Sequence, residues 1–318
     1  MKKIVLGTLS LTLLLAACGN NEEDTELDPA DGTVEDEDAE EVQESEGPRI
    51  LTDGLGNEVE IPEDPEAVLA SYLEDYLTAL DITPVAQWSI NDGEGVQTYL
   101  QDDLADVQTI PYDLPYESVM SVEPDLILIR DQIEQDMVDQ YNLIAPTYVL
   151  NASPTSWRET MSEIGRVLDR EDEAASVIET YDARAEETAS LVQETAQGES
   201  AAAIWMIDTS LFVVHPERSS GSVLYGDAGF EIPEVVDQLS DDADWAAVSL
   251  EELADMDVDH LFLISDGDSE LMEDRLWQNI PAVENDNVYT FDSQSAWLYY
   301  GPIANEQVLD HIDSSLQQ

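Results

Sequence analysis

The feature that most constrains this fold is an uninterrupted amphipathic segment in the middle of the chain, residues 173–197. Its apolar and small residues recur at alternating steps of four and three, the spacing of one face of an α-helix. They are Ala174, Ile178, Tyr181, Ala185, Thr188 and Val192. Asp172 is placed to cap the start and Gly198 to end the helix, which at 1.5 Å per residue would span about 37 Å. We interpret it as a rigid strut that joins two lobes; the alternative is a long helix covering a single sheet.

Short apolar runs alternate with helical segments on both sides of this helix, a pattern typical of α/β domains with parallel sheets. The most continuous runs are residues 125–130 (DLILIR) and 260–265 (HLFLIS), which indicates strands buried on both faces. We therefore expect an α/β fold of two doubly wound lobes. Its parts would be an N-terminal lobe at 49–156, helices including the strut at 157–197, and a C-terminal lobe at 198–318.

The first eighteen residues have the layout of a lipoprotein signal peptide. A positive start, MKK, precedes an apolar run at 4–14 that is short for a bilayer span. The following Leu15-Ala16-Ala17-Cys18 resembles a bacterial lipobox, and Cys18 is the only cysteine. We expect lipid on Cys18, such as palmitate, to anchor the protein to the outer face of the cell membrane. The alternative is an ordinary secretory signal.

Residues 19–48 are acidic and almost free of apolar side chains, which predicts a disordered tether.

The charge balance is extreme, with 73 acidic residues against 10 Lys and Arg. Such a charge repels itself at low ionic strength, whereas molar salt shortens the Debye length to about 3 Å. We interpret the acidity as halophilic adaptation, because 43% hydrophobic residues argue against an acidic disordered chain. Nucleic acid is excluded as a partner, since phosphate binding needs a basic patch.

Aromatic and basic residues follow the predicted strands of the first lobe. In a doubly wound sheet, ligands bind beyond the carboxyl ends of the strands. Tyr72, Trp88 and Arg130 occupy such places. We predict that they line a ligand site, although a place in the core is an equal alternative for Tyr72 and Trp88.

Several stretches, in order, resemble the iron–siderophore-binding lipoproteins of bacterial ABC importers, the class with a helical backbone between the lobes. They are LTDGLGNEVEIPEDPEAVLA, YESVMSVEPDLILI, SWRETMSEIGRVL, GSVLYGDAGFEIPE and WQNIPAVENDNVYTFD, and they run from about residue 50 to the C-terminus. The resemblance implies a two-lobed protein with small hinge closure. It also implies that the protein captures a ferric siderophore and delivers it to a permease driven by an ATPase.

The number of basic residues limits which class of ferric siderophore the protein can bind. Ferric catecholates and ferric citrate are anionic and call for a basic site, but only Arg130 and Arg218 fall in predicted cleft loops. One or two arginines with several aromatic rings suit a ferric hydroxamate, because Arg can donate to the iron-bound oxygens. By resemblance, Arg218, Trp297 and Tyr299 do this in the second lobe. The predicted ligand-binding residues are Tyr72, Trp88, Arg130, Arg218, Tyr225, Trp297 and Tyr299.

The resemblance also implies one surface carboxylate on each lobe that meets arginines of the permease. These positions correspond to Glu117 and to Glu231, with Glu234 as the alternative to Glu231. On so acidic a surface, composition alone would not single them out.

Other functions remain as alternatives. A cobalamin- or haem-binding lipoprotein would share the fold, and a ferric citrate or mixed citrate-hydroxamate ligand stays open. Catalysis is not expected, because no GxSxG, P-loop or HExxH motif is present. A free-metal site is not expected either, because the three histidines are scattered. We expect no cofactor and a monomer.

Overall fold

The long central helix forms as its spacing predicts. The computed structural model describes residues 49–130, 133–151, 156–238, 243–267 and 269–318, so the predicted signal peptide, Cys18 and the tether lie outside the described residues. Helix α6 runs over Glu171–Thr195, and all the predicted stripe residues are buried except the half-buried Ile178. The expected cap is wrong: the helix begins before Asp172, and Arg170 precedes it without a side-chain cap. Three acidic residues in the first turn face the positive end of the helix dipole instead.

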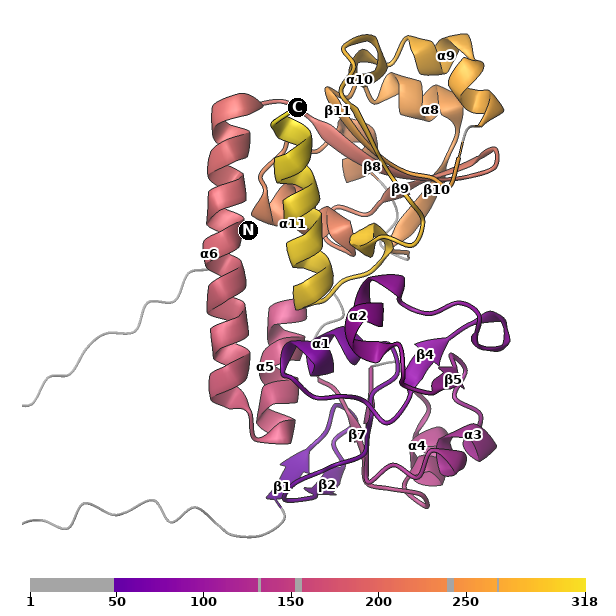
Figure 1. Ribbon diagram of the computed structural model, residues 1–318, viewed down its shortest axis with the longest axis vertical. Helices are drawn as coiled ribbons and strands as arrows, with labels where there is room; N and C mark the ends of the chain where they lie inside the picture. Colours follow the sequence, from indigo (N-terminus) through magenta and orange to yellow (C-terminus); the bar gives the residue numbers. More distant parts are fainter. Residues whose placement is uncertain (1–48, 131–132, 152–155, 239–242, 268) are drawn as a thin grey trace, which may run out of the picture. The chain divides into compact units, whose positions relative to one another are not determined.

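Helix α6 packs against helices rather than across one sheet. Figure 1 shows it beside α5 (Trp157–Leu168) and beside the C-terminal α11 (Pro302–Leu316). The approach to α5 is close, because a Cβ on Gly165 would lie 2.5 Å from the Cβ of Ala174. The main hydrophobic cluster continues from the first lobe through these helices into the second, and the described residues all belong to one compact unit. In the described residues, no helix has the length and apolar character needed to cross a bilayer.

The first lobe is α/β, but its sheet is divided. A three-stranded parallel sheet has the order β3-β6-β7, and a separate parallel pair is β4-β5. Val85 N donates to Val68 O at 2.9 Å between the two, and Pro84 beside it has no N–H to extend the ladder. The strands and helices are β1 (Arg49–Thr52), β2 (Glu58–Ile61), β3 (Val68–Leu69), α1 (Glu74–Ala79), β4 (Gln87–Ser89), α2 (Gln101–Leu104), β5 (Thr109–Pro111), α3 (Tyr116–Ser121), β6 (Leu126–Ile129), α4 (Gln135–Tyr141) and β7 (Thr147–Val149).

The second lobe holds a five-stranded sheet of order β10-β9-β8-β11-β12. Strands β8, β11 and β12 are parallel, whereas β9 and β10 run antiparallel, so the sheet is mixed rather than wholly parallel. The tight turn at Asp208, which has φ 53°, makes β8 and β9 a hairpin and forces the reversal. The elements are β8 (Ala201–Ile207), β9 (Ser210–Val214), the π-helical turn η3 (Ser222–Asp227), α7 (Glu234–Asp237), β10 (Trp245–Val248), α8 (Leu250–Asp255), β11 (His260–Ile264), α9 (Arg275–Gln278), α10 (Pro281–Glu284), β12 (Val288–Phe291) and η5 (Ala296–Leu298).

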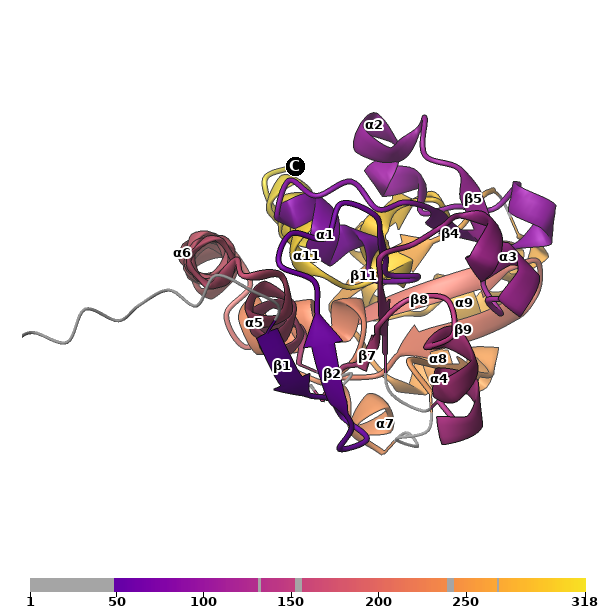
Figure 2. The ribbon, with the colours of Figure 1, turned by 90° about the horizontal axis from the view of Figure 1, so that it is seen from below.

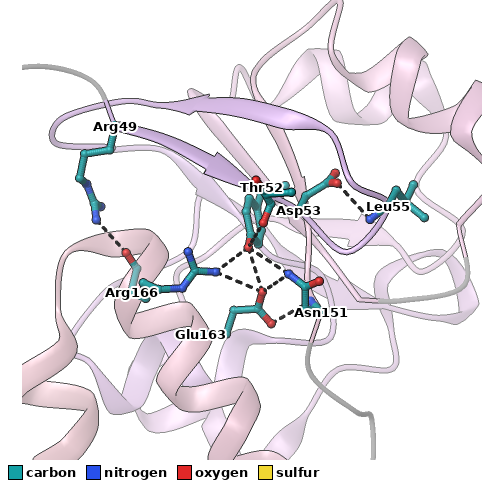
Figure 3. A network of polar contacts seen from close by, with 8 residues as sticks. Arg49, Thr52, Asp53, Leu55, Asn151, Glu163 and Arg166 are labelled. Carbon is teal, nitrogen blue, oxygen red and sulfur yellow. Dashed lines mark hydrogen bonds and ion pairs between the residues drawn. The ribbon is translucent and has the colours of Figure 1, made fainter. Parts of the chain in front are cut away.

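A polar network attaches the N-terminal hairpin to α5. Figure 2 shows β1 and β2 next to α5, and Figure 3 shows the contacts. Arg49 donates to the carbonyl oxygens of Arg166 and Val167, both at 2.8 Å, at the end of α5. The buried Glu163 accepts from Asn151 N at 2.8 Å and from Arg166. These arginines are therefore engaged in holding the fold together.

Candidate functional site

Three residues predicted from strand ends come together at one edge of the first lobe. Tyr72 follows β3, Trp88 lies in β4 and Arg130 follows β6. The Tyr72 and Trp88 rings meet edge to face with centroids 5.3 Å apart. The Arg130 guanidinium lies 5.5 Å from the Tyr72 ring centroid, within cation–π range. All three side chains are half-buried rather than enclosed in the core, as expected for residues that line a site.

The second lobe supplies aromatic residues to the same place. Tyr299 lies 6.2 Å from Tyr72 and 5.3 Å from Tyr99, measured between ring centroids. The Tyr300 ring lies 4.6 Å from the Arg130 guanidinium, which therefore sits against one tyrosine from each lobe. We call this group the inter-lobe cluster. Its members are Tyr72, Trp88, Tyr99, Arg130, Tyr299 and Tyr300.

The hydroxyl groups of Tyr72, Tyr99 and Tyr299 stay protonated at neutral pH. Burial raises the pKa of Tyr72, Tyr99 and Tyr299 above the usual range of a phenol, so none carries charge near neutrality. The cluster thus offers neutral ring faces, phenolic donors and the Arg130 guanidinium. Such a surface suits a bulky ligand of low charge.

Two residues in this region have an unusual backbone conformation. Tyr72 has φ 64° and Ser219 has φ 48°, which is the left-handed region that non-glycine residues seldom adopt. Each residue held in this conformation costs of order 1–3 kcal/mol, and other turns of the described chain, such as those at Asp169 and Asp208, use it as well. Both belong to turns that place predicted ligand-binding side chains, Tyr72 itself and Arg218.

Arg218 lies beside the cluster and is paired. Its guanidinium is 3.5 Å from the carboxylate of Asp244. The hydroxyl of the next residue, Ser219, donates to the carbonyl oxygen of Tyr299 at 3.2 Å. Asp244 also raises the pKa of Tyr72, although less than burial does, so the pair is electrostatically close to the cluster. Arg218 is thus held next to the Tyr299 segment, with Asp244 offsetting part of its charge.

Two predicted ligand-binding residues lie in the core instead. Trp297 is fully buried, donates its indole N–H to His311 Nδ1 at 3.0 Å and stacks on Phe262. Tyr225 is buried in η3, and its hydroxyl donates to the carbonyl oxygen of Ala201 at 3.0 Å. Their placement corrects the prediction of ligand contact, because their polar atoms are satisfied within the second lobe and their rings are covered.

Sequence reasoning missed Tyr99 and Tyr300. Tyr99 sits in a 3₁₀ turn, η2 (Thr98–Leu100), which follows no strand end, so the strand-end rule had no means of finding it. Tyr300 is the last residue of the aromatic run that begins at Trp297. Its place in that run is the feature of the sequence that could have indicated a role in the site. In this run the side chain of Tyr300, unlike that of Trp297, reaches the cluster.

A separate cavity lies on the second lobe, and no member of the inter-lobe cluster is among its lining residues. It has a volume of about 380 Å³ and lies where β8 and β11 end, lined by Trp205, Ile207, Asp208, Ser265, Asp266 and Ser293 among others. Beside it, Thr98 of the first lobe donates to Gln294 of the second at 2.7 Å. In the described part of the chain, no group of three or more His, Cys, Asp or Glu side chains is arranged to hold a metal ion.

The predicted docking carboxylates lie on the surface. Glu117 is exposed in the first turn of α3, and Glu231 and Glu234 are exposed before and at the start of α7. The backbone of Glu231 is held by an isolated parallel β-bridge to Ser200. Their role in docking stays a prediction.

A buried carboxyl group beneath the cluster makes stability depend on pH. Glu74 is fully buried, accepts from Trp88 N at 2.5 Å, and burial raises its pKa to about 8. Because the folded-state pKa exceeds the unfolded one, its stabilising contribution is complete below the unfolded pKa and is lost as pH rises through about 8. We expect the free energy of unfolding to fall by about 1–2 kcal/mol between about pH 7 and pH 9.

Glu74→Gln should remove most of this fall, because an amide does not ionise. Urea unfolding at constant high salt measures it, with Glu186→Gln on the exposed face of α6 as the control. Equal pH slopes in Glu74→Gln and the unaltered protein would show that another group is responsible.

Comparisons with known proteins show the family and the fold. The family model described as periplasmic binding protein matches residues 75–295. The chain is 26% identical to the iron-uptake system-binding protein of Bacillus subtilis over 91% of this chain and 90% of that one. It is 24% identical to the iron(3+)-hydroxamate-binding protein FhuD of B. subtilis, over 99% and 98%. The solved FhuD protein from S. pseudintermedius has the same fold, with a TM-score of 0.71 at 21% identity over 85% of this chain and 98% of that one. Since the family match covers more than half of its length, the chain belongs to the periplasmic binding protein family.

Proposed function

We propose that this protein is the substrate-binding component of an ABC importer and that it captures a ferric siderophore, of the hydroxamate type, for delivery to a permease. The family membership supports a binding role rather than a catalytic one. Relatives named for iron uptake and for iron(3+)-hydroxamate binding support the ligand class. The observation that carries the proposal is the inter-lobe cluster, in which Arg130 contacts the ring of Tyr72 of one lobe and the ring of Tyr300 of the other.

The distribution of arginines favours a chelate of low charge. Five of the eight arginines pair with carboxylates on, or at the end of, helices α5, α6 and α11. They are Arg49, Arg158, Arg166, Arg170 and Arg184. Arg275 is exposed on α9. Only Arg130 and the Asp244-paired Arg218 remain for the ligand, too few to offset a highly anionic chelate on a chain of formal net charge −63.

The ligand fits the surface chemically as well. Ring faces of the cluster can pack the apolar arms of a hydroxamate chelate, and the Arg130 guanidinium can donate to the anionic oxygens that bind the iron. Iron would arrive already enclosed by the siderophore. The protein therefore needs to recognise a shape and a weak charge, and it need not supply metal ligands of its own.

The setting proposed for this function is the outer face of the cell membrane. Lipid on Cys18 would anchor the chain, the acidic residues 19–48 would act as a leash, and the folded part would work as a monomer in a salty medium. Exposed Glu117 and Glu231 would meet the permease, which an ATPase drives.

A fluorescence titration tests the function directly. We expect ferrioxamine B, a ferric trihydroxamate, to quench the tryptophan emission with a dissociation constant of about 1 μM or below in high salt, because Trp88 lies in the cluster. Ferric citrate, a ferric tricatecholate, haem and cobalamin, titrated in parallel, should bind at least about tenfold more weakly. Tighter binding of any of these four would replace the proposed ligand.

A further inference from the structure

A carboxylate of the first lobe caps a helix of the second. Asp75, in α1, accepts from Ile303 N at its Oδ1 and from Ala304 N at its Oδ2, both at 2.9 Å. These two amides lie in the first turn of α11, where backbone N–H groups have no partner within the helix. The residue that precedes α11, Gly301, has no side chain with which to cap them. Asp75 is 1% exposed, so it satisfies them from across the lobe boundary without competition from water.

The same carboxylate also holds a ring of the inter-lobe cluster. The Tyr99 hydroxyl donates to Asp75 Oδ2 at 2.9 Å, and the Tyr99 ring packs on Tyr299. Tyr299 lies just before Gly301 and α11. Contacts therefore form a closed circuit from Asp75 to the start of α11, back along the chain to Tyr299, across to Tyr99 and again to Asp75. These contacts connect the position of α11 relative to α1 with the position of Tyr299 relative to Tyr99.

Gly301 shows how closely the chain is built around this carboxylate. It has φ 145°, a conformation that side-chain-bearing residues rarely adopt. A Cβ at this position would lie 2.4 Å from Asp75 Cγ. A side chain at residue 301 and a carboxylate at residue 75 thus exclude each other.

The contact is retained at an electrostatic cost. Burial raises the pKa of Asp75 to about 6, although three donors and the positive end of the α11 dipole favour its charged form. The neighbouring buried Glu74 adds no counter-charge. If the cap served only to stabilise α11, a polar side chain at position 301 could supply it. A capping group on the other lobe suggests that the contact also fixes the position of one lobe relative to the other.

We propose that Asp75 is a positioning residue that sets the distance between the two halves of the inter-lobe cluster, and through it the fit of the ligand. The inference rests on the proposed function, since it concerns ligand capture at that site. Asp75 is buried behind Tyr99, so it acts on the ligand through Tyr99, Tyr299 and the start of α11.

Asp75→Asn tests this with a change of a single atom type. The amide nitrogen would face a backbone N–H, donor against donor, so one of the two caps is lost. We expect the affinity for ferrioxamine B to fall by at least about tenfold. Hydrogen exchange at the Ile303 and Ala304 amides should also accelerate in the folded protein. The matched control is Asp81→Asn, an exposed residue just after α1 whose φ of 58° asparagine tolerates.

A double-mutant cycle separates positioning from general stability. Tyr99→Phe removes the hydroxyl that donates to Asp75 Oδ2 and should weaken ferrioxamine B binding, and in an Asp75→Ala background its additional effect should be markedly smaller. Additive effects, or Asp75→Asn protein that is folded at 25 °C and binds with unaltered affinity, would overturn the proposal. If the unaltered protein bound no ferric hydroxamate, the proposed function would fail, while fast exchange of the two amides in Asp75→Asn would still establish the cap.

Discussion

Replacing Arg130 with alanine is expected to weaken binding of ferrioxamine B by about 10- to 100-fold. The Arg130 guanidinium contacts both lobes of the cluster, at 5.5 Å from the Tyr72 ring centroid and 4.6 Å from that of Tyr300. Its loss removes charge-assisted hydrogen bonds to the iron-bound oxygens, each worth about 1.5–3 kcal/mol, and the cation–π contacts that order the two rings. The change in dissociation constant is measured by tryptophan quenching in high salt.

Two variants show whether the effect is specific to this guanidinium. Arg275→Ala removes the same charge from the exposed surface of α9 and should leave binding unchanged. Arg130→Lys keeps the charge but loses the planar donor group. Its affinity for ferrioxamine B should therefore lie between that of the unaltered protein and that of Arg130→Ala. Arg218→Ala should have a smaller effect than Arg130→Ala, because Asp244 already engages Arg218. Binding that is unaffected by Arg130→Ala would remove Arg130 from the site.

Reversing the charge of both proposed docking residues should abolish uptake and leave ligand binding intact. Glu117 and Glu231 are exposed, one on each lobe, and neither belongs to the inter-lobe cluster. Lysine at both positions would place like charges against the arginines expected on the permease, a repulsion of several kcal/mol. The measurement is accumulation of radioactive iron supplied as ferrioxamine B by cells that carry the double variant, beside the affinity of the purified protein.

The control reverses two other exposed glutamates, Glu123 and Glu251, one on each lobe. The net charge of this variant equals that of the docking variant, so it should transport normally if position matters more than total charge. Equal losses of uptake in both variants would mean that the overall acidity, and not a docking contact, supports transport. Glu234→Lys in place of Glu231→Lys decides between the two candidates in the second lobe.

Periodicity and strand patterns predicted the elements that bury one continuous face. The α6 stripe is correct in five of its six positions because a long helix leaves little freedom in which side faces the core. The runs around Leu126–Ile129 and His260–Ile264 became central, fully buried strands for the same reason. Strand ends then located Tyr72, Trp88 and Arg130, because parallel strands present their carboxyl ends along one edge.

The features that the sequence did not reveal depend on tertiary contacts. Trp297 and Tyr299 are two residues apart, yet the 3₁₀ turn between them sends one ring into the core and the other to the cluster. The cap of α11 joins residues 228 positions apart, which no local pattern encodes. Strand β10 is short and only half-buried, so it lacks both the continuous run and the alternation that mark a strand.

A crystal structure of the protein with ferrioxamine B tests the central claim most directly, namely that the chelate binds between the lobes at the inter-lobe cluster. We predict iron-bound oxygens within hydrogen-bonding distance of the Arg130 guanidinium, with the hydroxamate arms against the rings of Trp88, Tyr72 and Tyr299. A chelate found only in the cavity at the ends of β8 and β11, or on the outer face of α5 and α6, with Arg130 still enclosed by Tyr72 and Tyr300, would contradict it.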